Sequence, residues 1–109
     1  MIDSILRLAK RECPKSGHKI FRHFAAVVKG GAIIAVAVNR NERHAEVNAL
    51  NQLWPNKRKN SIVWSIRMTK TGKISNAKPC DECLPYLISN GVKKVYFSTT
   101  DGNIECMRL

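Results

Sequence analysis

The chain has 109 residues, of which 44% are hydrophobic and 25% charged. This ordinary globular composition argues against disordered and fibrous classes and leaves room for one hydrophobic core. No apolar run approaches the roughly 18 residues of a membrane span, and Arg7, Lys10 and Arg11 interrupt the start of the chain where a signal peptide needs a continuous apolar stretch. We therefore expect a single cytoplasmic or nuclear domain over residues 1–109. The 19 Lys and Arg against 8 Asp and Glu give a formal charge of +11, which favours a phosphate-bearing partner such as a nucleotide or a polynucleotide.

The first half of the chain alternates helical and extended patterns. Apolar residues at helical spacing, ended by Pro14, predict a first helix over about residues 3–13. Residues 24–28 and 32–38 are β-rich runs separated by a glycine pair, which predicts a β-hairpin. Residues 42–53 carry a second apolar helical face, with Asn41 as a cap and a proline after its end, so we expect a second helix there.

The next two elements are a strand and a helix. Residues 61–68 predict a buried third strand, followed by a turn at residues 71–73 and a loop as far as Pro79. Residues 80–89 predict a third helix. Because proline is tolerated only in the first turn of a helix, Pro85 indicates that this helix begins nearer Cys83.

The end of the chain predicts a second hairpin. Residues 92–98 predict a fourth strand, and Asp101-Gly102 reverses the chain into a short fifth strand at 104–107. A parallel crossover needs a dozen or more residues, which the connection lacks, so the last strand must be antiparallel to its neighbour. The predicted fold is a three-layer α/β domain with one mixed five-stranded sheet and helices on both faces.

Two short motifs carry the chemistry, His44-Ala45-Glu46 and the Pro-Cys-Asp-Glu-Cys run at 79–83. A catalytic zinc typically takes three protein ligands and keeps a fourth position for water. His44, Cys80 and Cys83 give this number, which predicts one Zn²⁺ per chain. Each motif lies at a predicted helix start, where the unpaired N–H groups favour a thiolate over a thiol.

Glu46 is left over as a carboxylate that the metal does not need. Its expected role is that of a general acid-base group that transfers protons between water and a substrate. Residues 44 and 46 point in different directions inside a helix, so they can converge only at a helix start. A redox role for Cys80 and Cys83 is disfavoured because no apolar strand leads directly into the motif.

The remaining cysteines and histidines have ordinary explanations. In a cytosolic chain the cysteines are expected to be ligands or free thiols, not disulfides. Cys13 and Cys106 are expected to be buried thiols, and His18 and His23 to be surface residues of a basic stretch. If Cys106 or His23 supplied a fourth ligand, the site would be closed and structural.

The joint occurrence of H-x-E and P-C-x-x-C resembles the signature of the zinc deaminases of nucleobases. From residue 24 to residue 109 the element order is similar to that of the cytidine and deoxycytidylate deaminase superfamily. This resemblance implies a zinc-dependent hydrolase that converts cytosine to uracil in cytidine, deoxycytidine or dCMP, or in single-stranded nucleic acid. It also implies that Asn39 and the backbone around Ala45 contact the substrate. The hairpin ending resembles the branch that holds free cytidine deaminases and some nucleic-acid deaminase toxins.

The substrate and the partners stay open at this level. Three Phe, two Trp and two Tyr offer few stacking surfaces, which favours a small substrate, whereas the charge of +11 favours a polynucleotide. An adenosine-to-inosine deaminase of transfer RNA shares the zinc chemistry, but that branch inserts a helix before a parallel fifth strand. A zinc-stabilised nucleic-acid-binding module without activity is a further alternative. A small domain with an exposed sheet edge is expected to form a homo-oligomer.

Overall fold

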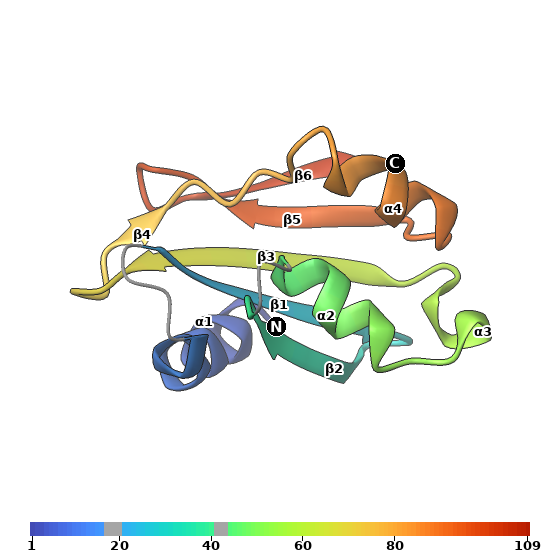
Figure 1. Cartoon of the computed structure of the whole chain (residues 1–109), viewed down its shortest axis with the longest axis horizontal. Coiled ribbons are helices and arrows are strands. Elements are labelled where there is room, and N and C mark those ends of the chain that lie inside the picture. Colours follow the sequence, from blue (N-terminus) through green and yellow to red (C-terminus); the bar gives the residue numbers. More distant parts are fainter. Residues whose placement is uncertain (17–20, 41–43) are drawn as a thin grey trace.

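The computed structural model describes residues 1–16, 21–40 and 44–109. Figure 1 shows its elements, which follow one another as α1 (Ile2–Glu12), the 3-10 helix η1 (Cys13–Ser16), β1 (Phe21–Lys29), β2 (Ala32–Val38), α2 (Ala45–Asn51), α3 (Pro55–Arg58), β3 (Ile62–Thr69), β4 (Ile74–Ser75), α4 (Cys83–Ser89), β5 (Lys94–Ser98) and β6 (Ile104–Arg108). No helix in these described segments is long and apolar enough to cross a membrane.

One mixed sheet forms the centre of the fold, with the strand order β2-β1-β3-β5-β6. β1 pairs antiparallel with β2 and with β3, β3 pairs parallel with β5, and β5 pairs antiparallel with β6. The predicted mixed sheet and the antiparallel last strand are therefore confirmed. The sheet also has a sixth strand, β4, which pairs only with the end of β3. The sequence predicted a loop there, because two residues are too few to show an alternating pattern.

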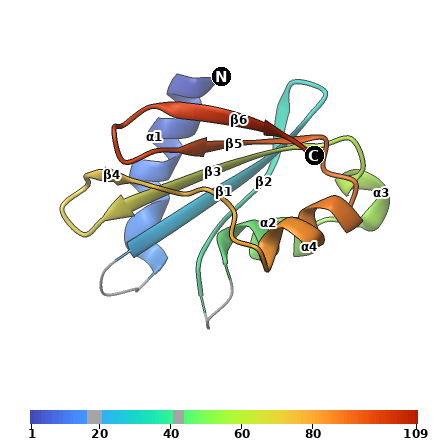
Figure 2. The same cartoon turned by 90° about the horizontal axis from the view of Figure 1, so that it is seen from above.

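The sheet carries helices on both faces, as predicted, and Figure 2 shows α1 on one side and α2 with α4 on the other. Successive side chains of a strand point to opposite faces, so each face has its own core. The core beneath α1 consists of Ile5, Ala9, Cys13, Phe24, Ala26, Val28, Val38, Trp64, Ile66 and Met68. The core beneath α2 and α4 consists of Ala25, Val27, Ala35, Ala45, Ala49, Leu50, Val63, Ala77, Leu87, Val92, Val95 and Phe97.

The β1–β2 turn follows the predicted glycine pair. Gly30 and Gly31 have φ values of +59° and +79°, and the flanking residues Lys29 and Ala32 pair with each other. A two-residue hairpin turn with positive φ at both positions is one that glycine adopts without a steric penalty. The resulting hairpin brings the end of β2 next to the beginning of β1.

The helices after β2 agree with the prediction in part. α2 ends at Asn51 and its described part begins at Ala45, while the predicted cap Asn41 and the predicted helical residues 42 and 43 lie outside the described residues. α3 was not predicted; it begins with Pro55, which fits a first helical position because that N–H needs no partner. α4 begins at Cys83, which places Pro85 in the first turn as the sequence required.

Adjacent residues of α4 offer a test of this packing. Leu87 of α4 is fully buried in the core, whereas its neighbour Ile88 is 57% exposed. We expect Leu87→Ala to lower the free energy of unfolding by about 2 to 5 kcal/mol, because it leaves a cavity in a packed core. Ile88→Ala should change it by less than about 0.5 kcal/mol. Urea unfolding of the two variants measures the difference, and equal losses would contradict the placement of α4.

Candidate functional site

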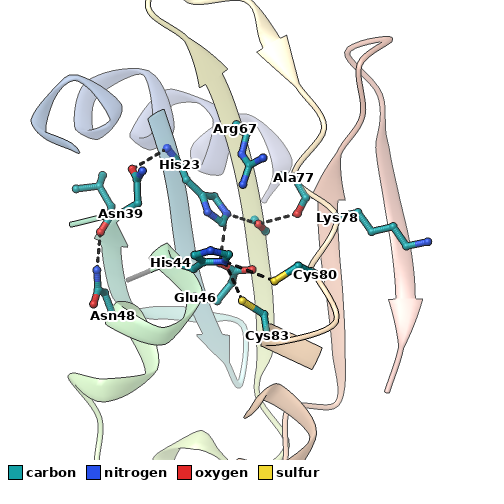
Figure 3. Close-up of polar contacts among 12 residues, drawn as sticks. His23, Asn39, His44, Glu46, Asn48, Arg67, Ala77, Lys78, Cys80 and Cys83 are labelled. Atoms are coloured by element: carbon teal, nitrogen blue, oxygen red, sulfur yellow. Dashed lines mark hydrogen bonds and ion pairs between the residues drawn. The ribbon is translucent and has the colours of Figure 1, made fainter. Parts of the chain in front are cut away.

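The starts of α2 and α4 bring the two motifs together. α2 and α4 lie on the same face of the sheet and contact each other. His44 is the residue before the first turn of α2, and Cys83 is the first residue of α4. Figure 3 shows the His44 ring pointing toward the sulfur atoms of Cys80 and Cys83. Residues 36 and 39 positions apart in the chain thus share one site.

The potential ligand atoms of this group lie close enough together to share one metal ion. His44 Nδ1 lies 2.9 Å from the sulfur of Cys83 and 3.8 Å from the sulfur of Cys80. All three ligand atoms lie within 4.8 Å of one another. Zinc–ligand bonds of about 2.0 to 2.3 Å in a tetrahedron separate the ligand atoms by roughly 3.6 Å. One imidazole and two thiols at this spacing fit a single zinc ion.

The local backbone explains this convergence. His44 has φ −70° and ψ 153°, an extended conformation, so the helix begins only after it. The Cys80 carbonyl accepts hydrogen bonds from the N–H groups of Cys83 and Leu84, which forms a tight turn into α4. This turn brings Cys80 onto the same side as Cys83, as the C-x-x-C spacing predicted.

The Cys83 thiol is not activated by its position alone. Burial, with a smaller contribution from the Glu46 charge, raises the pKa of Cys83 above its ordinary value. The predicted effect of the helix start is therefore outweighed by desolvation. A bound dication removes such a proton directly, so this donor set suits a metal ion and not a free reactive thiolate.

Glu46 lies behind the ligand group and is fully buried. Neither of its carboxyl oxygens receives a hydrogen bond from the residues that the structure describes. Burial raises the pKa of Glu46 to about 7, and its own backbone N–H and the cation of Arg67 oppose the shift only in part. A carboxyl group with a pKa near 7 can both accept and donate a proton near neutral pH. Among the described residues, the group that could bind a metal consists of His44, Cys80 and Cys83, and Glu46 does not belong to it.

The sequence interpretation of His23 is wrong. It predicted a surface residue, but His23 is 3% exposed and faces the site from β1. Its Nε2 lies 2.6 Å from the Ser65 hydroxyl and 3.4 Å from Glu46 Oε1. Burial, followed by the charges of Arg67 and His44, lowers the pKa of His23 to about 3, so the ring is neutral at physiological pH.

A signal for His23 was present in the sequence. Strand alternation places residue 23 on the same face as Ala25 and Val27, which is the face that carries α2 and α4. The basic residues around it favoured a surface position instead. His18, assigned to the surface by the same argument, lies outside the described residues.

The two predicted substrate contacts lie at the rim and at the helix start. Asn39 follows β2, and its Oδ1 accepts a hydrogen bond from the backbone N–H of His23 at 3.0 Å. Asn39 in turn donates its backbone N–H to the His23 carbonyl at 3.1 Å. Ala45 is the first residue of α2, between His44 and Glu46, and is fully buried. Both positions border the site, while their contact with a substrate stays a prediction.

The two other cysteines take no part in the group. Cys13 is buried in the core beneath α1, as predicted, and burial raises its pKa to about 11. Cys106 lies on β6 and is exposed, which corrects the prediction that it is buried. Cys106 is exposed because β6 is an edge strand, which has a neighbouring strand on one side only. Among the described residues, neither Cys106 nor His23 joins the metal-binding group.

Comparisons with known proteins agree with this geometry. The model of the cytidine and deoxycytidylate deaminase zinc-binding region matches residues 2–99. The chain therefore belongs to this family, and its cofactor is zinc. No curated protein sequence matches the chain significantly.

The fold is also similar to that of a solved structure of RibD from Acinetobacter baumannii. The TM-score is 0.58 and the sequence identity is 21% over 86% of this chain. The match covers 25% of the RibD chain, so the present chain spans a small part of that protein's length. At this identity the likeness establishes the fold alone.

Removal of one ligand tests the metal site. We expect about one zinc per purified chain, and Cys83→Ala to lose it together with thermal stability, because two ligands hold zinc poorly and the metal ties α2 to α4. Cys106→Ala is the matched control, since this thiol is exposed and lies outside the group. Metal analysis and thermal melting measure both effects. Full zinc content in Cys83→Ala would contradict the assignment.

The buried carboxyl group predicts a pH dependence of stability. In the zinc-free chain Glu46 keeps its proton up to about pH 7 when folded, but only to about 4.5 when unfolded. The folded state binds the extra proton in this window, so the group lowers the free energy of unfolding as the pH rises. Glu46→Gln cannot ionise and should gain on the order of 2 to 3 kcal/mol over wild type between pH 4.5 and 8.

The difference between variant and wild type is the quantity to measure. His23 contributes the opposite trend in wild type, because its lowered pKa makes the folded state gain stability as the pH rises toward 6.5. Urea unfolding at several pH values gives the difference directly. A difference that does not change with pH would show that Glu46 is not desolvated.

Proposed function

We propose that the chain catalyses hydrolytic deamination of cytosine to uracil, with release of ammonia, in a nucleoside or nucleotide or in single-stranded nucleic acid. The observation that carries this proposal is the placement of the buried Glu46 carboxyl beside the group of His44, Cys80 and Cys83. A zinc site that only stabilises the fold does not require a buried acid next to it. Because an acid buried without a hydrogen-bond donor lowers stability, its presence favours a catalytic role.

The metal-binding residues and Glu46 have different roles in this reaction. His44, Cys80 and Cys83 hold the zinc, which when bound supplies the Lewis acidity that lowers the pKa of water to about 7. Glu46 accepts a proton from water and delivers protons to the ring nitrogen and to the departing amine, so that water and cytosine become uracil and ammonia. Its raised pKa suits it to both directions of transfer.

Asn39 and Ala45 are proposed to orient the base. The hydrogen bond from His23 to Asn39 Oδ1 fixes which way the amide faces, so its position is set before substrate arrives. Ala45 lies between a proposed zinc ligand and the proposed acid-base residue, so a base held against its backbone lies close to both. Preorganised contacts of this kind lower the entropic cost of reaching the reactive geometry.

The hairpin at the end of the chain favours cytosine over adenine as the base that is deaminated. β5 and β6 form an antiparallel hairpin, the arrangement of the cytidine deaminase branch, in contrast to the parallel fifth strand of the transfer-RNA adenosine deaminases. The charge of +11 supports a phosphate-bearing substrate. Lys78 is an exposed cation on the loop that leads to Cys80, and Figure 3 shows its side chain directed away from the ligand group.

The test is a deamination assay on zinc-loaded protein. We expect uracil from cytidine, deoxycytidine, their monophosphates or a cytosine-containing single strand, and no inosine from the adenine counterparts. Glu46→Gln should lower kcat by about 10²- to 10⁴-fold while it keeps its zinc. A Glu46→Gln protein with full zinc and full biological activity would instead establish a binding module.

Salt dependence distinguishes the two classes of substrate. Polynucleotide binding releases counterions, so activity on a single strand should fall steeply as salt rises. Activity on a free nucleotide should fall only slightly. Comparison of the two substrates at several salt concentrations, below saturation, identifies which one the basic surface serves.

A further inference from the structure

A chain of buried polar groups runs from the proposed acid-base residue to the loop before Cys80. The Ser65 hydroxyl lies 3.0 Å from the carbonyl oxygen of Ala77, which can only accept, so the hydroxyl proton of Ser65 points to Ala77. Ser65 Oγ therefore offers only lone pairs to His23 Nε2, which lies 2.6 Å away. It follows that His23 Nε2 carries a proton, and the neutral ring is the Nε2–H tautomer.

The same ring nitrogen lies near Glu46. His23 Nε2 lies 3.4 Å from Glu46 Oε1, and both side chains are almost completely buried. At this separation the two atoms make no hydrogen bond, and the N–H already points to Ser65 Oγ, so a shift of a few tenths of an ångström lets Ser65 and Glu46 share it. Neither carboxyl oxygen has a hydrogen bond within the described residues, and besides the backbone N–H of Glu46 itself, His23 is a side-chain donor placed to orient this group.

We propose that His23 is a positioning residue for the reaction, which holds the Glu46 carboxylate in its working orientation through the Nε2–H group. This inference rests on the proposed role of Glu46. A neutral donor suits that role, because it fixes the orientation of the carboxylate without the full countercharge that would make it a weaker base. Glu46 acts on the substrate, and His23 acts through Glu46.

The backbone of His23 extends the same control to the substrate side. Its N–H and carbonyl form two hydrogen bonds with Asn39, one to the amide oxygen and one from the backbone. Ser65 continues the chain to Ala77, three residues before Cys80, and Ala77 donates its own N–H to Ser98 at 2.9 Å. His23 therefore fixes where the side-chain amide of Asn39, which we propose binds the base, lies relative to the carboxyl group of Glu46.

Nuclear magnetic resonance of the zinc-loaded protein with ¹⁵N-labelled histidine tests the hydrogen bond without any assay of activity. We expect the His23 ring to carry its proton on Nε2 at pH 8, with the signal assigned by its loss in His23→Gln. Glu46→Gln should shift this proton resonance upfield, because a charged acceptor is replaced by a neutral one. A proton on Nδ1, or a resonance that Glu46→Gln leaves unchanged, would overturn the proposal.

Kinetics test the consequence. His23→Leu fills the space without a donor, and we expect kcat to fall about 10- to 100-fold with KM changed less than about 3-fold and zinc retained. His23→Gln keeps an N–H donor and should recover most of kcat. Val27→Ala is the control, since Val27 is buried on the same face of β1 but belongs to the apolar core.

The outcomes separate the two proposals. Equal losses of kcat in His23→Leu, His23→Gln and Val27→Ala would reduce His23 to a packing residue and overturn the inference. A wild-type protein that deaminates none of the substrates would overturn the proposed function. In that case the resonance measurement still decides whether His23 donates to Glu46.

Discussion

The convergence of His44 with Cys80 and Cys83 is the constraint on which the arrangement of the molecule depends. These side chains come from two helix starts, and they meet only if both helices lie on one face of the sheet with their first turns side by side. The order of strands β1, β3 and β5 provides this, since α2 precedes β3 and α4 forms the crossover from β3 to β5. The core beneath α2 and α4, with Leu50 and Leu87 fully buried, packs the two helices against the sheet.

The two faces of the sheet divide stability and chemistry between them. The face beneath α1 is apolar throughout its core cluster. The opposite face carries the buried polar groups His23, Glu46 and Ser65 next to the ligands. Burial of such groups costs free energy that the apolar residues of both faces must offset. The apolar core beneath α1 contributes to offsetting this cost.

Electrostatics near the site follow from the same burial. Desolvation raises the pKa values of Glu46 and Cys83 and lowers that of His23, so each group tends toward its neutral form. A dication reverses this tendency for the thiols, because it supplies the charge that the interior lacks. The site is thus arranged for a metal ion, and the neutral His23 leaves the basicity of Glu46 intact.

The sequence by itself determined the mixed sheet, the two hairpins, the start of α4 and the set of three metal-binding residues with one acid. Each of these rests on a local signal: the turn residues Gly30-Gly31 and Asp101-Gly102, apolar periodicity, the position of Pro85, and ligand types at fixed spacing. Family membership followed from the same motifs. The two-residue β4 and the short α3 carry too little pattern to be predicted.

Only the tertiary structure decided which other residues surround the acid. His23 and Ser65 lie 42 positions apart, and the antiparallel pairing of β1 with β3 brings Ser65 to the His23 ring, which lies next to Glu46. It also decided that Cys106 is exposed and that burial outweighs the helix start at Cys83. Burial and long-range contact depend on strand register and helix placement. A local pattern specifies which residue types are present, but not the neighbours that set their pKa values and orientations.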